Sequence, residues 1–249
     1  MPEPKNQQIT ALVPPDQLKP SPDQPNMPPP ILQHGYLVWR NTGTGTMIVT
    51  NLLDPSGQHH KTEGRAAIQC FTTCYPYVIT VHENDSLQVL NVATNQCDLF
   101  AQEKGTTEGI RRVLANTSVI VGVAPKRMVV WELENMATKP PRVIDTSTAP
   151  MHIMSTSEMS TLVSNTRVVL MNTNPSGHLF QVWDLAAGKL VAYAENPSKI
   201  ETFFSFGANA DGTVVGTCRD CLYIWLTSGA PGLVEPFQTV KFDGCLLSS

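Results

Sequence analysis

From residue 35 onward, short runs of apolar and β-branched residues alternate with polar turns. No long stretch shows the 3.6-residue spacing of an amphipathic helix. Runs of this length, bounded by turn residues, are typical of short antiparallel strands. The pattern therefore predicts an all-β fold.

One apolar segment recurs five times, at intervals of roughly forty residues. The five copies are residues 47–52, 87–92, 128–133, 180–185 and 222–227. The last four copies each follow another apolar run after a short turn, and these runs are 77–81, 119–123, 168–171 and 214–217. Two apolar runs joined by a short turn indicate a β-hairpin, so the chain repeats a hairpin.

Further strands flank each predicted hairpin. Candidates upstream are residues 67–71, 110–114, 151–154 and 202–206, and candidates downstream are 96–100, 142–145 and 189–193. Four strands in about forty residues make one blade of a β-propeller, and Trp183-Asp184 is the dipeptide typical of WD repeats. We predict a WD-repeat-like β-propeller of about five four-stranded blades, either closed with five or an incomplete seven-bladed ring. Trp131, Trp183 and Trp225 are expected to pack between blades.

The first part of the chain has a different composition. Ten of the 20 prolines fall within residues 1–33, so we predict a Pro-rich disordered tail there and the propeller over residues 34–249. The prolines at 28–30 suit either a polyproline ligand or, by preference, a plain spacer. The first repeat shows no innermost strand, and the C-terminal run 237–247 is the candidate to pair with it. An open ring would expose an apolar blade face and favour a partner.

The composition of the chain disfavours several classes of protein. The chain has 249 residues, 15% of them charged, and a formal net charge of −4, which does not favour nucleic-acid binding. It has no apolar run long enough to cross a membrane, and its six cysteines are too sparse for a disulfide scaffold. Because its first residues are polar and interrupted by prolines, we expect no secretory leader. We expect a cytoplasmic protein.

The third to fifth repeats resemble a known family. Residues 113–122 run into 128–136, and then follow 143–150 and a polar hairpin ending at 177–185. This order of a strand pair, an Asn-Met turn, Asp-Thr and a Pro-Ser-Gly hairpin resembles the PROPPINs, the phosphoinositide-binding propellers of autophagy and endosomal membranes. The resemblance spans roughly residues 65–230 and implies a role on such membranes.

The family's lipid motif is absent. PROPPINs carry a Phe/Leu-Arg-Arg-Gly signature after the fifth blade, and its paired guanidinium groups suit phosphate oxygens. Here the corresponding residues 233–240 read Leu-Val-Glu-Pro-Phe-Gln-Thr-Val, without arginine. The resemblance therefore implies that the usual phosphoinositide site is lost or relocated.

One repeat concentrates basic residues. The candidates for a relocated lipid site are Arg111, Arg112, Lys126 and Arg127, with Lys139 and Arg142 following in the outer turn. Such a cluster suits a phosphoinositide or an acidic peptide, and the alternative is an ordinary solvated blade edge. No aromatic residues are interleaved with the basic ones, as a single-stranded nucleic-acid site would require.

Other candidate chemistry is weaker. Cys218 and Cys221 have the spacing of a zinc knuckle, but they also flank a predicted turn, and the other close pair, Cys70 and Cys74, is far away in sequence. We expect no metal and no cofactor. The pair His59-His60 is expected in an exposed loop, and the glycine-rich residues 41–46 are expected to form a turn.

The acidic residues do not suggest an active site. The carboxylates that a propeller enzyme would need around its channel are represented only by Glu83, Asp85, Asp98 and Glu108, which have no paired spacing. No nucleophile elbow, P-loop or dinucleotide fingerprint is present. We therefore expect neither enzymatic activity nor a small-molecule substrate.

These observations favour a non-enzymatic, PROPPIN-like interaction scaffold in autophagy or membrane trafficking. Its expected contact surfaces are the blade edges, the ring face and the Pro-rich tail. The alternative is a phosphoinositide-dependent recruitment module that uses the relocated basic patch. A third hypothesis, a propeller enzyme, lacks the cluster of carboxylates it needs. We expect the protein in the cytoplasm, or peripherally on endosomal or autophagic membranes.

Overall fold

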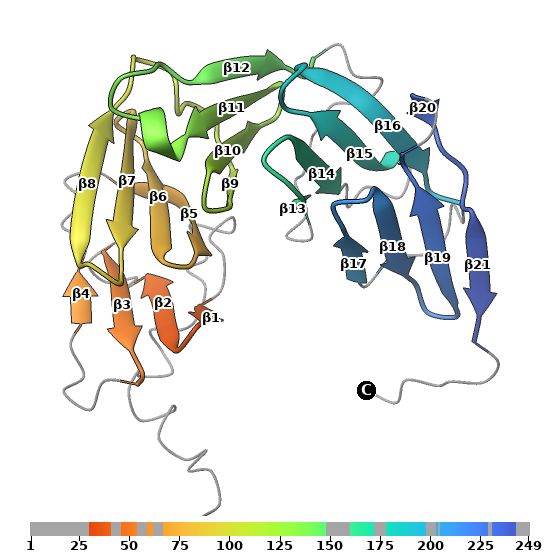
Figure 1. Ribbon diagram of the computed structural model, residues 1–249, viewed down its shortest axis with the longest axis horizontal. Coiled ribbons are helices and arrows are strands. Elements are labelled where there is room, and N and C mark those ends of the chain that lie inside the picture. The colour runs from red at the N-terminus through yellow and green to blue at the C-terminus, as the bar shows by residue number, and fades with distance from the viewer. Residues whose placement is uncertain are drawn as a thin grey trace, which may run out of the picture. The chain divides into compact units, whose positions relative to one another are not determined.

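The described residues form β-sheets in which all neighbouring strands are antiparallel except the parallel pair β16 (Lys189–Glu195) and β20 (Gly232–Leu233) (Figure 1). A computed structural model describes residues 30–40, 46–53, 59–61, 67–147, 160–171, 178–197, 203, 205–228 and 231–242. These residues form five sheets, and the chain divides into two compact units, Met1–Val113 and Leu114–Ser249. The boundary falls within one strand, and each unit is described by itself.

The first unit holds two four-stranded sheets, each with its strands in chain order. The first sheet contains β1 (Ile31–Gln33), β2 (Tyr36–Arg40), β3 (Met47–Asn51) and β4 (His59–Lys61). The second sheet contains β5 (Ile68–Cys74), β6 (Tyr77–His82), β7 (Ser86–Asn91) and β8 (Gln96–Ala101). Every neighbouring pair in these sheets is antiparallel.

Alternating side chains join these two sheets. Residues on one face of β2 and β3, including the register pair Val38 and Val49, share a buried cluster with Ile68, Phe71 and Leu90 of the second sheet. Successive side chains of a strand point to opposite faces, so the alternate residues Leu37, Trp39 and Ile48 form a second buried cluster. Burial of a large apolar side chain contributes about 1.5–3 kcal/mol.

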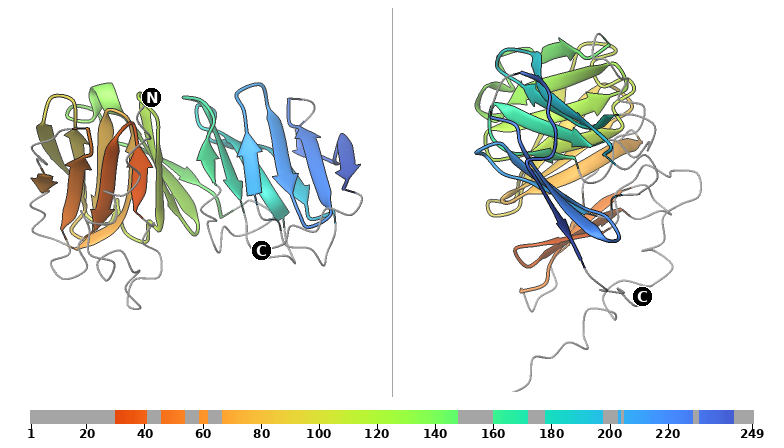
Figure 2. Two further views of the ribbon diagram at one scale, coloured as in Figure 1. Left: turned by 90° about the horizontal axis from the view of Figure 1, so that it is seen from below. Right: turned by 90° about the vertical axis from the view of Figure 1, so that its right-hand side faces the viewer.

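The second unit continues with three sheets. The third sheet contains β9 (Arg112–Ala115), β10 (Val119–Ala124), β11 (Arg127–Glu132) and β12 (Arg142–Asp145), with a 3₁₀ helix at Leu133–Asn135. The fourth contains β13 (Thr161–Leu162), β14 (Arg167–Met171), β15 (His178–Asp184), β16 (Lys189–Glu195) and β20 (Gly232–Leu233). The fifth contains β17 (Ser205–Ala208), β18 (Thr213–Thr217), β19 (Cys221–Leu226) and β21 (Gln238–Lys241). Figure 2 shows the twist of the sheets.

The predicted tryptophans are core residues. Trp183 lies in a buried cluster that joins the third and fourth sheets, and Trp225 lies in one that joins the fourth and fifth. The ring of Trp225 meets Phe180 edge to face, with 5.3 Å between ring centroids. Trp131 is also buried. Edge-to-face aromatic pairs add about 0.5–1.5 kcal/mol beyond their burial.

The structure confirms the repeated hairpins and corrects the chain ends. The predicted pairs become β6–β7, β10–β11, β14–β15 and β18–β19. The innermost strand of the first sheet is β1, which lies inside the predicted tail and pairs with β2. Residues 34 and 35 have φ values of 47° and 79°, so they form the two-residue turn that this hairpin needs. Residues 1–29 and 41–45 lie outside the described residues.

Two further expectations are wrong, and a third lies outside the described residues. The C-terminal run was expected to complete the first sheet, but β21 pairs with β19 of the fifth sheet. The pair His59-His60 was expected in a loop, but it lies in β4 opposite β3. The candidate strand at 151–154 lies outside the described residues, and the innermost strand of the fourth sheet is β13.

Candidate functional site

The basic residues singled out by the sequence do not fall within one compact unit. Arg111 is exposed just before β9, and Arg112 is partly buried at the first position of that strand. Lys126 is exposed in the turn between β10 and β11, and Arg127 begins β11. Arg111 and Arg112 belong to the first unit, whereas Lys126 and Arg127 belong to the second. A single lipid-binding patch formed by all four stays a prediction.

The positive charge of the partly buried Arg112 acts on the thiol of Cys70. Burial raises the pKa of the Cys70 thiol to about 12, and the positive charge of Arg112 offsets part of that effect. A Coulombic effect of this kind needs the two groups to be close together. Arg112 therefore differs from the exposed Arg111, and the two do not present a matched pair of guanidinium groups to solvent.

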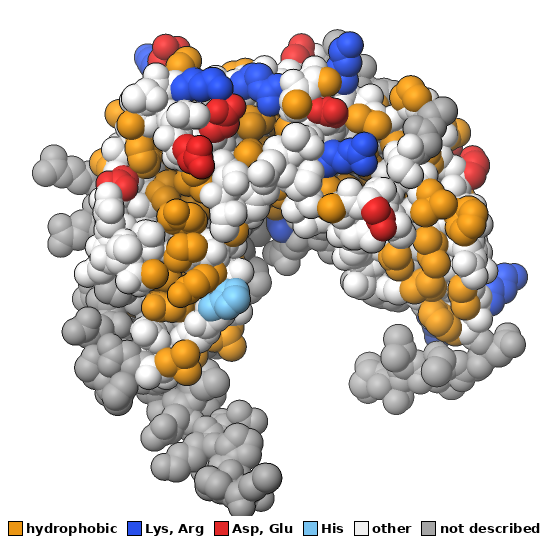
Figure 3. Space-filling view, in the orientation of Figure 1, with side chains coloured by type: hydrophobic (Ala, Val, Ile, Leu, Met, Phe, Trp, Pro, Cys, Tyr) orange, Lys and Arg blue, Asp and Glu red, His pale blue; other side chains and the backbone are white. Residues whose placement is uncertain are grey.

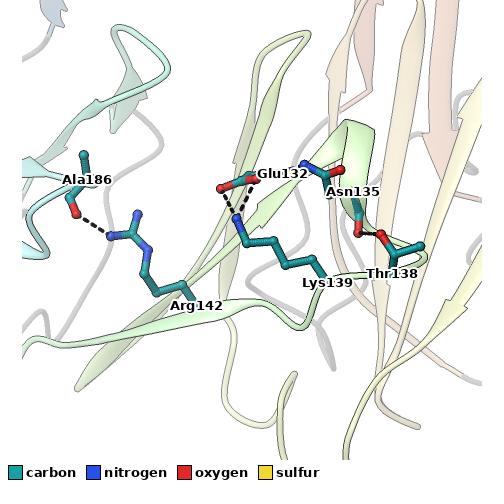
Figure 4. Close-up of polar contacts among 6 residues, drawn as sticks. All are labelled: Glu132, Asn135, Thr138, Lys139, Arg142 and Ala186. Atoms are coloured by element: carbon teal, nitrogen blue, oxygen red, sulfur yellow. Dashed lines mark hydrogen bonds and ion pairs between the residues drawn. The ribbon is translucent and has the colours of Figure 1, made fainter.

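The outer turn of the third sheet carries a compact polar cluster (Figure 4). Lys139 donates hydrogen bonds from Nζ to both carboxylate oxygens of Glu132, each at 2.9 Å. Asn135 donates to the same carboxylate at 3.2 Å. These hydrogen bonds and the charge of Lys139 lower the pKa of Glu132 below its usual value. The sequence analysis noted Lys139 but missed Glu132, which lies seven residues earlier.

Arg142 connects this turn to the next sheet. Its Nη1 donates a hydrogen bond of 2.7 Å to the carbonyl oxygen of Ala186, in the turn between β15 and β16 (Figure 4). Glu132, Lys139 and Arg142, with Val130 and Pro140, line a pocket of about 70 Å³, which we call the edge pocket. Two cations and one carboxylate give it a net positive charge. A pocket of this size holds a few water molecules or one small acidic group.

The carboxylate Asp85, considered for an active site, has a structural position. It follows β6 in the turn to β7 with φ of 55°, and its Oδ2 accepts a hydrogen bond of 2.8 Å from the backbone N–H of Gly105. Its Oδ1 accepts from both the backbone N–H and the hydroxyl of Thr107, at 2.9 and 3.0 Å. Asp85 therefore holds the connection that follows β8.

The cysteines behave as small structural residues. Cys218 and Cys221 flank the turn between β18 and β19, as the sequence indicated, and Cys218 donates from both its N–H and its thiol to the Cys221 carbonyl. Cys70 and Cys74 lie in β5, within the other unit. In the part of the chain that the structure describes, no three His, Cys, Asp or Glu side chains form a group able to hold a metal ion.

Exposed apolar side chains concentrate near the end of the described chain. Among the described residues, nine large hydrophobic side chains are exposed, and four of them fall between residues 226 and 242. These four are Leu226, Leu233, Phe237 and Phe242, and we call them the C-terminal apolar surface. Figure 3 shows hydrophobic side chains gathered over β19. The backbone there is held in place, because the N–H of Phe237 donates to Ile224 and that of Phe242 donates to Asp220.

Comparison with solved structures decides the fold. Hsv2 of Kluyveromyces marxianus matches 86% of this chain, with 9% identity and a TM-score of 0.57. The chain has a β-propeller fold. Hsv2 is a PROPPIN, so the structural likeness agrees with the resemblance drawn from the sequence. The propeller also matches the computationally designed Ika8 protein, with 13% identity over 86% of the chain and a TM-score of 0.54.

A third similar propeller is U3-55K, which matches 83% of the chain with 14% identity and a TM-score of 0.53. The chain spans 66% of the Hsv2 structure, 61% of Ika8 and 64% of U3-55K. No protein-family model matches the sequence, and no curated protein matches it. In the described residues, no helix is long and apolar enough to cross a membrane.

Proposed function

We propose that this chain is a non-enzymatic propeller scaffold that binds other proteins, with a PROPPIN-like role in autophagy or membrane trafficking. It works in the cytoplasm, peripherally on endosomal or autophagic membranes. The observation that supports this proposal best is the C-terminal apolar surface. Exposed apolar side chains on a backbone that is held by hydrogen bonds are typical of protein-interaction sites.

Phe237 is the strongest single contact candidate on this surface. Its side chain is 70% exposed, while its backbone N–H donates to the carbonyl of Ile224 at 2.7 Å. An aromatic side chain has few rotatable bonds, and on a backbone that is already held in place it adds contact area at little cost in backbone entropy, as interface anchors do. The position of Asp85 also supports a non-enzymatic role, because its carboxylate is already used by Gly105 and Thr107.

Affinity capture with quantitative mass spectrometry tests the scaffold. The double variant Leu226→Ser, Phe237→Ser should lose a defined set of proteins that the unaltered chain captures from cell extract. The matched control is Leu99→Ser, because Leu99 is also an exposed hydrophobic residue but lies in β8 of the first unit. The proposal fails if the double variant and the control capture the same proteins at the same level.

One observation supports the alternative function, recruitment to a lipid membrane. Arg111 and Lys126 are both exposed, so both are accessible to an anionic headgroup. Under this alternative, the chain floats with liposomes containing phosphatidylinositol 3-phosphate and not with matched liposomes lacking it. Charge reversal of Arg111 and Lys126 should then abolish flotation. A folded chain that stays at the bottom of the gradient with both liposomes contradicts it.

A further inference from the structure

The outer strand of the third sheet has an open edge. In the part of the chain that the structure describes, β12 pairs only with β11 (Figure 1). The N–H of Thr146 donates to the carbonyl of Lys126, which makes them a hydrogen-bonded pair one step beyond the end of β12. Hydrogen-bonded and non-hydrogen-bonded pairs alternate along an antiparallel ladder. The N–H and C=O groups of Val143 and Asp145 therefore point away from β11, toward the open edge.

In the same unit, another outer strand has an added strand paired to its edge. The outer strand of the fourth sheet, β16, is joined by the short parallel strand β20, with Gly232 opposite Ala192 and Leu233 opposite Tyr193. The N–H of Val234 continues the ladder by donating to the carbonyl of Tyr193 at 2.8 Å. A short extended segment of the same chain thus adds to an outer strand of this molecule through backbone hydrogen bonds. β12 occupies the corresponding outer position in the third sheet.

The edge pocket gives the β12 edge a charge preference. It lies at the Arg142 end of β12, where Lys139 and Arg142 outnumber the single carboxylate of Glu132. At the other end of the strand stands Asp145, whose carboxylate would repel a second acidic group. Between the two ends, the side chain of Val143 is 55% exposed and offers an apolar contact. Because successive side chains of a strand point to opposite faces, the pocket and Arg142 lie on one face of β12, and Val143 and Asp145 lie on the other.

We propose that β12 docks an extended segment of a partner protein as an added strand, with an acidic side chain of that segment in the edge pocket. Backbone hydrogen bonds to Val143 and Asp145 supply affinity, and the pocket supplies specificity. The acidic group takes a hydrogen bond and charge from Arg142 and Lys139, partly displacing Glu132. This inference rests on the proposed scaffold function and names one partner chemistry for it, on a surface separate from the C-terminal apolar surface.

The test uses the full chain, labelled with ¹⁵N, and the probe peptide acetyl-Glu-Val-Thr-Val-Thr-amide. Saturable shifts are expected at the amide signals of Val143 and Asp145. Replacing the glutamate of the probe by glutamine should weaken binding about tenfold, because a charge-assisted hydrogen bond is lost. A probe methylated at its backbone nitrogens should not bind, because it cannot complete the ladder.

Variants of the chain test the pocket separately from the edge. Arg142→Gln should remove the preference for the glutamate probe over the glutamine probe, whereas Lys126→Gln, an exposed cation of the same sheet, should leave the preference intact. Glu132→Gln should strengthen binding of the glutamate probe, because a competing carboxylate becomes neutral.

Three results overturn the proposal: no shift with millimolar probe, shifts that map away from β12, or equal binding of the glutamate and glutamine probes. These results do not depend on the C-terminal apolar surface, because the variants at Leu226 and Phe237 leave β12 unchanged. If those variants lose captured proteins while the β12 amide signals do not respond to the probe, the scaffold function is supported and the proposal for β12 is wrong.

Discussion

Asp85 is joined to Thr107 by two hydrogen bonds to one carboxylate oxygen, although the two residues are 22 positions apart. The hydroxyl of Thr107 also lies 3.1 Å from the carbonyl oxygen of His82, at the end of β6. Thr107 is fully buried. The pair therefore links the turn between β6 and β7 to the connection that follows β8, two segments that are distant in sequence.

Asp85→Ala should destabilise the chain by about 1–3 kcal/mol, because the N–H groups of Gly105 and Thr107 lose their acceptor. Asp85→Asn should cost less, since asparagine keeps an acceptor and tolerates the positive φ at this position. Urea unfolding followed by tryptophan fluorescence measures both. Asp98→Ala is the control, because Asp98 is exposed and, among the described residues, accepts side-chain hydrogen bonds from Gln96 alone. Equal midpoints for the Asp85 and Asp98 variants would contradict the structural role.

Gly216→Ala should also destabilise the chain. A Cβ at Gly216 would lie 2.5 Å from Phe206 and 2.9 Å from Phe203, whose rings stack on each other. Overpacking of this kind typically costs about 1–3 kcal/mol. Gly207→Ala is a matched control in the adjacent strand, because a Cβ there meets nothing within 4 Å. Thermal unfolding should show a lower midpoint for the first variant only, and a shift of the same size in both would sink the packing argument.

The cysteines should differ sharply in reactivity toward a thiol reagent at pH 8. Burial raises the pKa of Cys70 to about 12, so its thiol stays protonated and enclosed in the folded chain. Cys97 is exposed, although desolvation also raises its pKa. Peptide mapping after brief labelling should find modified Cys97 and unmodified Cys70. Labelling of Cys70 as fast as Cys97 under native conditions would show that β5 is not enclosed as described.

Lys139→Ala should raise the titration midpoint of Glu132. The pKa of Glu132 is lowered first by the hydrogen bond from Lys139, then by Asn135 and by the Lys139 charge. A lowered carboxyl pKa favours the folded chain at pH values above the unfolded pKa, and that contribution is lost as pH falls through the folded value. NMR titration of the side-chain carboxyl measures the midpoint. An unchanged midpoint in Lys139→Ala would mean that the ion pair does not persist in solution.

Most of the sheet architecture could be predicted from the local sequence. Strands such as β6, β10 and β18 are short runs of mainly apolar or β-branched residues bounded by turns, so these strands and their hairpins could be predicted from neighbouring residues alone. The burial of Trp183 and Trp225 follows from the same pattern. Strands of two or three residues, such as β1, β4 and β20, are too short to show a period.

The site depended on contacts between residues that are distant in sequence. Neither the pairing of Glu132 with Lys139 nor the hydrogen bond from Arg142 to Ala186 follows from composition or periodicity, because each requires a particular turn to bring its partners together. In the sequence Asp85 is an isolated carboxylate, and only the fold brings Thr107 within hydrogen-bond distance of it. The sequence by itself determined where the longer strands and their hairpins lie, because each is an apolar run between polar turns. Only the tertiary structure decided which strand edges stay open and which charges meet there, since both depend on packing between separate segments.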